Sequence, residues 1–167
     1  MLCGFQAYVA GEILDPWSLL DGKRLLSSLF ENLFAQDKRT EGQRAQWVQT
    51  TKEKSALFVR RVKQMIEEVG HIPDLAGSGN LMLQKTGEIR LVDINNISPV
   101  SFDPEIRLDD KGYPVCDKSI EALSLIETKI LGEPIDRGEP IYRTFLAPDR
   151  IRQVKIREER FYRNQSG

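Results

Sequence analysis

The sequence predicts an α+β fold that is mainly helical, and two patterns support this prediction. Apolar residues recur at helical spacing in three stretches, which are residues 16–35, 43–69 and 117–131. Two short apolar runs, residues 81–84 and 88–94, flank a turn that contains Gly87, which is typical of a β-hairpin. With 167 residues the chain is long enough for one domain with its own core. We therefore expect a single domain over residues 1–167, with the helices packed around the hairpin.

Each predicted helix has its own start and stop signals. The first begins at Pro16, with Asp15 as its N-cap, and the third begins at Asp117, which is expected to cap it. Gly70 follows the second helix and Gly132 follows the third, where glycine commonly ends a helix. Residues 3–9 predict a short strand before the first helix, and residues 95–116 predict irregular structure.

Composition and charge exclude several classes of protein. The chain has 24 Lys and Arg against 25 Asp and Glu, a net charge of −1, which argues against general nucleic-acid affinity. Cys3 and Cys116 are too few for a disulfide scaffold and lack zinc-site spacing. No apolar run approaches the roughly 20 residues of a membrane span, and no basic region precedes the first apolar stretch. We expect a cytoplasmic protein without membrane contact.

The hairpin brings metal-ligating residue types together. Asn80 lies just before its first strand and Asp93 near the end of its second, so antiparallel pairing places the two positions close together. A carboxylate and an amide oxygen suit Mg²⁺, which takes one or two protein oxygens and completes its shell with water and nucleotide phosphates. Asp74, in the preceding loop, is then a candidate base or orienting group for an attacking hydroxyl.

A purely structural interpretation of these residues stays open. Asn80 can form an Asx turn at the start of a strand, and Asp93 can cap a loop. Asp74 follows a proline and precedes a Gly-Ser-Gly loop, where an aspartate is often only a turn residue. The spacing of the three residues is what favours chemistry.

This segment resembles the catalytic and metal-binding loops of the protein-kinase-like superfamily, which includes the aminoglycoside and choline phosphotransferases. In that superfamily a histidine precedes the catalytic aspartate, an asparagine and a hairpin follow, and a metal-binding aspartate comes thirteen residues after the asparagine, as Asp93 follows Asn80 here. The resemblance implies that Asp74 is catalytic, that Asn80 and Asp93 bind Mg²⁺, and that His71 packs the catalytic loop. The interval from Asp74 to Asn80 is one residue longer than usual, and Asp-Ile-Asn replaces Asp-Phe-Gly.

The resemblance extends over residues 3–135. The stretch from Asp117 is similar to the central helix of the large lobe, whose opening aspartate holds the backbone of the catalytic loop. The amino-terminal stretch resembles the hinge, whose backbone binds adenine, and this implies that Tyr8, Val9 and Ala10 line the base pocket for ATP.

The resemblance implies a C-terminal (large) lobe that starts at the hinge strand. The Gly-rich loop, the strand lysine and its glutamate partner all belong upstream of the hinge. We expect either a fragment of a longer kinase-like protein or a scaffold that lost its small lobe, and a start within a strand favours truncation. Such a chain alone would be a poor kinase.

Three functions follow as hypotheses. The first is a kinase-like phosphotransferase fragment or remnant that binds Mg-ATP and transfers phosphate to an unknown hydroxyl acceptor. The second is a non-catalytic, pseudokinase-like interaction module. The third is an unrelated helical domain in which the hairpin motif is coincidental.

The carboxyl-terminal stretch and the amino-terminal surface bear on partners. Residues 139–167 form a basic extension, which we interpret as a solvated helix face because it lacks the aromatic pattern of a nucleic-acid surface. If the small lobe is missing, apolar surface near Phe5, Tyr8 and Leu14 is exposed and favours self-association.

Overall fold

The computed structural model describes residues 9–92 and 96–165. Its helices are α1 (Gly22–Leu33), α2 (Glu41–Val69), α3 (Val115–Ile126), the π-helix η1 (Glu127–Leu131), α4 (Pro140–Phe145) and α5 (Pro148–Gln165). Its strands are β1 (Glu12–Ile13), β2 (His71–Pro73), β3 (Leu81–Leu83), β4 (Ile89–Leu91) and β5 (Ile97–Pro99). The predicted α+β class with mainly helical content is confirmed.

Helix α2 is the longest element, and its ends follow from local chemistry. Thr40 caps the first turn in a capping box with Gln43, so that each side chain accepts a hydrogen bond from the other residue's backbone amide. Gly70 ends the helix in the left-handed conformation with φ 64°. Its buried stripe includes Trp47, Val59 and Ile66. The predicted helix over 43–69 is confirmed, with a start two residues earlier.

The predicted start of the first helix is wrong. Helix α1 begins at Gly22 and is capped by Asp21, whose carboxylate accepts a hydrogen bond from the Arg24 amide. The Nζ of Lys129 donates to the carbonyl oxygens of Pro16 and Ser18, at 2.8 and 2.6 Å. These contacts hold the segment against η1, and the chain is irregular up to the Asp21 cap.

Helix α3 also begins earlier than the sequence predicts. It starts at Val115, and the N-cap position is Pro114, which has no side-chain cap. The expectation that Asp117 caps the helix is wrong, because this side chain is 3 % exposed and pairs with Arg150 instead. The predicted end is confirmed, since Gly132 closes η1 with φ 77°.

The strands form two small antiparallel sheets. The predicted hairpin is confirmed as β3 and β4, in which Leu81 lies opposite Leu91. Strand β1 adds to the hairpin with Glu12 opposite Leu83, so pairing occurs at residues 12–13, beyond the strand that the sequence predicted over residues 3–9. The strand predicted over residues 3–9 lies outside the described residues except for its last position. The stretch predicted to be irregular contains β5, which pairs with β2.

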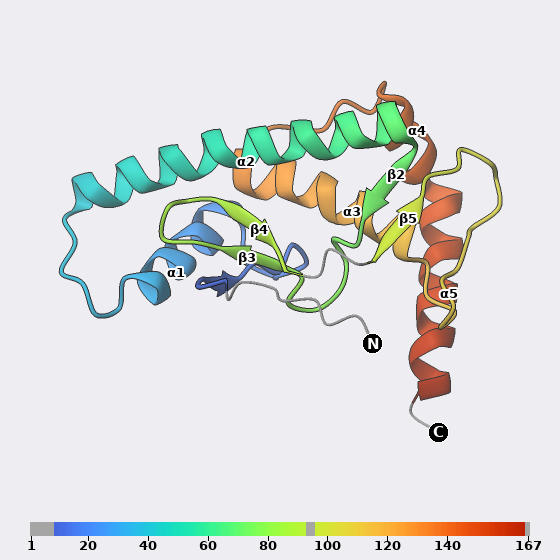
Figure 1. The fold of residues 1–167 in the computed structure, drawn as a ribbon, viewed down its shortest axis with the longest axis horizontal. Coiled ribbons are helices and arrows are strands. Elements are labelled where there is room, and N and C mark those ends of the chain that lie inside the picture. Colours follow the sequence, from blue (N-terminus) through green and yellow to red (C-terminus); the bar gives the residue numbers. More distant parts are fainter. Residues whose placement is uncertain (1–8, 93–95, 166–167) are drawn as a thin grey trace, which may run out of the picture.

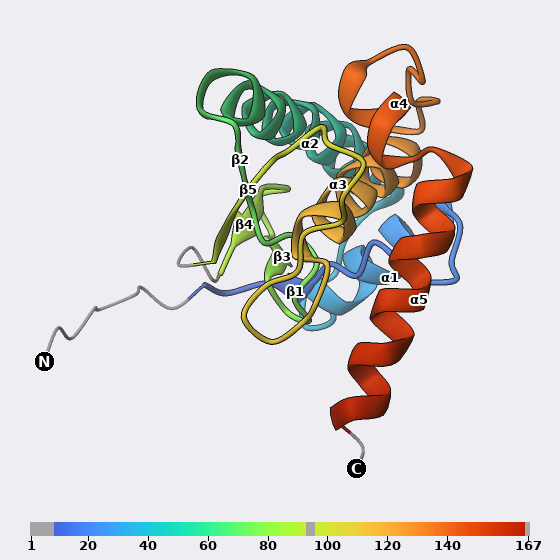
Figure 2. The same cartoon turned by 90° about the vertical axis from the view of Figure 1, so that its right-hand side faces the viewer.

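Figure 1 shows how these elements are arranged around α3. Helix α2 runs above α3, while α1 and the β3–β4 hairpin lie towards one end and the β2–β5 pair towards the other. Figure 2, turned by 90°, shows α5 along the side of the molecule. Ile120, Ala122 and Leu123 of α3 have no exposed surface, so this helix forms the centre of the core.

The remaining predictions concern the apolar surface near the amino terminus and a membrane span. Leu14, which the sequence placed near an exposed apolar surface, is 3 % exposed and belongs to the core. Phe5 and Tyr8 lie outside the described residues. No helix in the described part of the chain has the length and apolar character needed to cross a membrane.

The start of α1 packs directly on η1, and this predicts the effect of a small substitution. A Cβ atom added at Gly22 would lie 1.9 Å from the Lys129 carbonyl oxygen, so the two backbones must separate. We expect Gly22→Ala to lower the free energy of unfolding by about 1–3 kcal/mol, measured by urea denaturation. The control is Gly42→Ala, where the nearest atom is 3.9 Å away and alanine should be neutral or slightly stabilising. Equal stability of the two variants would contradict the packing argument.

Candidate active site

Asp74 is held at the junction of the two small sheets. It follows β2 directly, and its backbone amide donates to the Asn96 carbonyl oxygen at 2.8 Å, which extends the pairing of β2 with β5. The residue is 7 % exposed. A carboxylate this buried requires polar partners.

The Asp74 carboxylate organises the loop that follows it. Its Oδ1 accepts hydrogen bonds from the backbone amides of Ala76 and Gly77, both at 2.9 Å. Its Oδ2 accepts from the side-chain amide of Asn96 at 3.0 Å. Both oxygens are thus engaged, and the loop is wrapped around the side chain in the manner of an Asx turn.

Asn80 closes the same loop. Its Nδ2 donates to the Asp74 carbonyl oxygen at 3.0 Å, and its backbone amide donates to the Gly77 carbonyl oxygen at 3.0 Å. A Cβ atom at Gly77 would lie 2.3 Å from Nδ2, so the glycine is what allows this side chain to cross the loop. The structure therefore brings together two of the residues that the sequence singled out.

Helix α3 supports the loop through Ser119. The Leu75 backbone amide donates to the Ser119 Oγ at 3.1 Å, and the serine has no exposed surface. The resemblance implied that Asp117 would hold this backbone, and that prediction is wrong. Asp117 instead accepts two hydrogen bonds from Arg150, at 2.5 and 3.2 Å.

His71 does not pack the loop as the resemblance implied. Its side chain is exposed, and Nδ1 lies 2.6 Å from the Val69 carbonyl oxygen. Because the described contacts of this ring are with the end of α2, we assign it no chemical role.

The remaining predicted residues are only partly described. Asp93 and Tyr8 lie outside the described residues. Ala10 lies near the turn of the hairpin, where its carbonyl oxygen accepts from the Gln84 side chain at 3.4 Å. Val9 precedes it and is partly buried. These two positions are therefore beside the turn end of β3, whereas Asn80 is at the opposite end of that strand.

The described residues supply few ligands for Mg²⁺. Within residues 9–92 and 96–165 there is no group of three or more His, Cys, Asp or Glu side chains arranged to hold a metal ion. The Asn80 Nδ2 faces the Asp74 carbonyl oxygen, because only the nitrogen of an amide side chain can donate to a carbonyl. The Asn80 Oδ1 is therefore the atom of this side chain that can bind a cation, and Asp93, the second ligand that the sequence predicted, lies outside the described residues.

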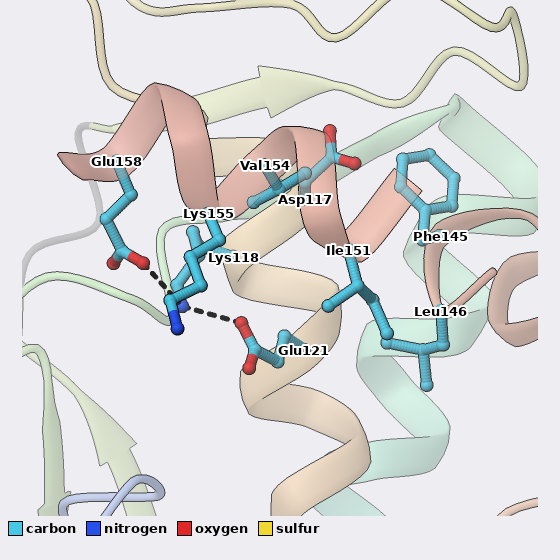
Figure 3. Close-up of a pocket in the computed structure, with 9 residues that line it drawn as sticks. All are labelled: Asp117, Lys118, Glu121, Phe145, Leu146, Ile151, Val154, Lys155 and Glu158. Atoms are coloured by element: carbon cyan, nitrogen blue, oxygen red, sulfur yellow. Dashed lines mark ion pairs between the residues drawn. The ribbon is translucent and has the colours of Figure 1, made fainter. Parts of the chain in front are cut away.

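A separate pocket of about 210 Å³ lies between α3, α4 and α5. Figure 3 shows Lys118 at its rim between Glu121 and Glu158, at 2.6 and 3.3 Å, with Phe145 and Leu146 at the apolar end. Neither Asp74 nor Asn80 lines it. Because the pocket shares no lining residue with the Asp74 loop, it is not part of the candidate site.

Sequence reasoning missed Asn96, Ser119 and the role of Gly77. Only Gly77 had a visible signal, as one of the two glycines in the loop before Asn80. Asn96 and Ser119 meet the loop through tertiary contacts, Ser119 at a separation of 44 residues.

Comparisons of the chain with models of protein families, with curated proteins and with solved structures find no match in any of the three.

Proposed function

We propose that this chain forms part of an ATP-dependent phosphotransferase site of the protein-kinase-like type, the C-terminal (large) lobe of that fold. Asn80 and Asp93 bind Mg²⁺, and Asp74 aligns the hydroxyl group of the acceptor. The hydrogen bond from the Asn80 Nδ2 to the Asp74 carbonyl oxygen carries the proposal, because it joins the proposed metal ligand to the proposed catalytic residue in one closed loop.

The backbone of the hairpin supports the metal ligands. The Val92 amide donates to the Asn80 carbonyl oxygen at 2.8 Å, so Val92 and Asn80 are paired across the two strands. Asp93 follows Val92 directly along the chain, and its carboxylate is the second ligand that we propose for a cation bound to the Asn80 Oδ1.

Each residue has a separate task in this proposal. Mg-ATP supplies the transferable phosphoryl group, and the metal neutralises charge on the phosphates. Asp74 accepts the proton or the hydrogen bond of the acceptor hydroxyl through an oxygen that the Asn96 amide now occupies. Ser119 keeps the loop backbone fixed while this exchange of partners takes place.

Titration calorimetry of the full chain with ATP tests the proposal. We expect binding that needs Mg²⁺ and that weakens by roughly tenfold or more in Asp93→Ala, because a charged ligand is lost. The control is Glu133→Ala, an exposed acidic residue in a loop, which should leave the affinity unchanged. Absence of binding, or Mg-dependent binding that survives in Asp93→Ala, would overturn the proposal.

One observation favours a second function, a non-catalytic interaction module. Both oxygens of the Asp74 carboxylate accept hydrogen bonds from the loop itself, which is sufficient reason for the aspartate without chemistry. This module predicts that Asp74→Asn changes neither folding nor partner binding, and that the chain shows no Mg-ATP binding at all.

A further inference from the structure

The pairing of β2 with β5 determines which backbone groups of β5 are used. Asp74 donates to the Asn96 carbonyl oxygen and Val100 donates to the Gly70 carbonyl oxygen, both at 2.8 Å. Antiparallel neighbours alternate between hydrogen-bonded and non-hydrogen-bonded pairs. Residues 96, 98 and 100 therefore direct their backbone groups towards β2, and Ile97 and Pro99 direct theirs away.

The outward edge of β5 is open within the described chain. The sheet has only β2 and β5 among the described strands, and the Ile97 side chain is 48 % exposed. Pro99 is consistent with this orientation, because a proline lacks an N–H group and is tolerated where that group would face away from the partner strand. The edge then offers one donor, the Ile97 amide, and two acceptors, the carbonyl oxygens of Ile97 and Pro99.

This edge borders a groove with room for another strand. A cavity of about 290 Å³ is lined by residues 96–99 on one side, by residues 107–110 on the other, and by Val115 and Cys116. No residue of β2 lines it, so it lies on the open side of β5. Figure 1 shows the segment after β5 leaving the strand and returning to the start of α3.

The lining of the groove combines apolar and polar residues, and its charged side chains are one basic and two acidic. Arg107 pairs with Asp103 at 3.8 Å, and both side chains are exposed to solvent. The acidic side chains that line the groove are Asp109 and Asp110. The Asp109 Oδ1 accepts from the amides of Lys111 and Tyr113. Asp110 is exposed and is the carboxylate that can meet a basic side chain. Burial raises the pKa of the Cys116 thiol to about 12, so the thiol is protonated at neutral pH and is no nucleophile.

We propose that the open edge of β5 binds an extended peptide from a partner protein as a third strand, with a basic side chain of that peptide facing Asp110. The peptide would accept from the Ile97 amide and donate to the carbonyl oxygens of Ile97 and Pro99. Three paired residues span about 10 Å. This inference goes beyond the proposed phosphotransferase and does not depend on nucleotide binding.

The test uses the full chain and an array of blocked heptapeptides that alternate Val or Thr with Lys or Glu. We expect Lys-containing peptides to bind and to protect the Ile97 amide from hydrogen exchange. Ile97→Pro removes the outward amide and should weaken the tightest peptide by roughly tenfold. Ile97→Ala keeps the amide and should change the affinity by less than about threefold. Backbone N-methylation of the peptide should abolish its binding.

Several outcomes would overturn the proposal. They are no binding by any peptide of the array, equal binding by Ile97→Pro and Ile97→Ala, and tight binding by the N-methylated peptide.

Two other outcomes would overturn it by assigning the edge to a different occupant. A concentration-dependent dimer that Ile97→Pro dissociates would assign it to a second copy of the chain. Protection of the Ile97 amide without peptide that disappears when residues 1–8 are deleted would assign it to this chain's own amino terminus.

Discussion

Replacing Arg150 with methionine is expected to lower the free energy of unfolding by about 3–5 kcal/mol. The guanidinium group donates to both carboxylate oxygens of Asp117, and its Nη1 donates to the Asp103 carbonyl oxygen at 2.7 Å. Arg150 is 8 % and Asp117 3 % exposed. Methionine fills a similar volume but leaves a buried carboxylate without its partner, and this uncompensated charge dominates the cost. Urea denaturation followed by circular dichroism measures the change.

Two further variants separate charge from packing at Arg150. The double variant Arg150→Met with Asp117→Leu removes both charges and should recover most of the lost stability, because the pair gives up much of its attraction in desolvation. The exposed control is Arg152→Met, whose pair with Asp149 is solvent-exposed and should contribute less than about 1 kcal/mol. A double variant as unstable as the single one would show that packing, rather than the buried charge, explains the loss.

The Arg150 interactions also link the helices to the rest of the fold. Through Asp117 the guanidinium joins α5 to the first turn of α3, and through Asp103 it holds the segment that follows β5. That segment leads to residues 107–110, which form one wall of the groove beside β5. Loss of Arg150 is therefore expected to disturb the groove even where the fold survives.

Local patterns in the sequence predicted most elements but not where all of them begin. The capping box and Gly70 define α2 from residues within the helix itself. The irregular segment before α1 is held by Lys129, which is 113 residues away from Pro16 along the chain. The start of α3 likewise involves Arg150 rather than a local cap. Contacts between distant residues override a local preference of about 1 kcal/mol for a capping position.

In the candidate site, too, local features could be predicted from the sequence and contacts between distant residues could not. The sequence placed Asp74 in the loop before Asn80, and five residues separate the two, so this loop can close through its own hydrogen bonds. Ser119 and Asn96 could not be predicted, since their roles depend on how α3 and β5 pack against the loop. The pairing of Asn80 with Asp93 remains a prediction, because Asp93 lies outside the described residues.

Asp74→Ala is expected to lower the free energy of unfolding by about 2–4 kcal/mol, because hydrogen bonds to a carboxylate contribute more than neutral ones. The backbone amides of Ala76 and Gly77 and the side chain of Asn96 all lose their acceptor. Urea denaturation gives the stability, and the amide shifts of residues 75–80 report whether the loop keeps its conformation.

Asp74→Asn separates the two roles of this side chain. The asparagine keeps an oxygen for the two backbone amides. Its new NH₂ group can donate to the Asn96 side-chain oxygen once that amide flips by 180°. We expect a loss of less than about 1 kcal/mol, an unchanged loop, and Mg-ATP binding like that of the unsubstituted chain. If Asp74 aligns the acceptor, phosphoryl transfer by a protein that joins this chain to a kinase-like small lobe should fall by about a hundredfold or more in this variant, since general-base catalysis contributes 10²–10⁴-fold. Transfer at an undiminished rate would leave the aspartate only its role in folding the loop, because an asparagine can satisfy the same hydrogen bonds but cannot accept a proton.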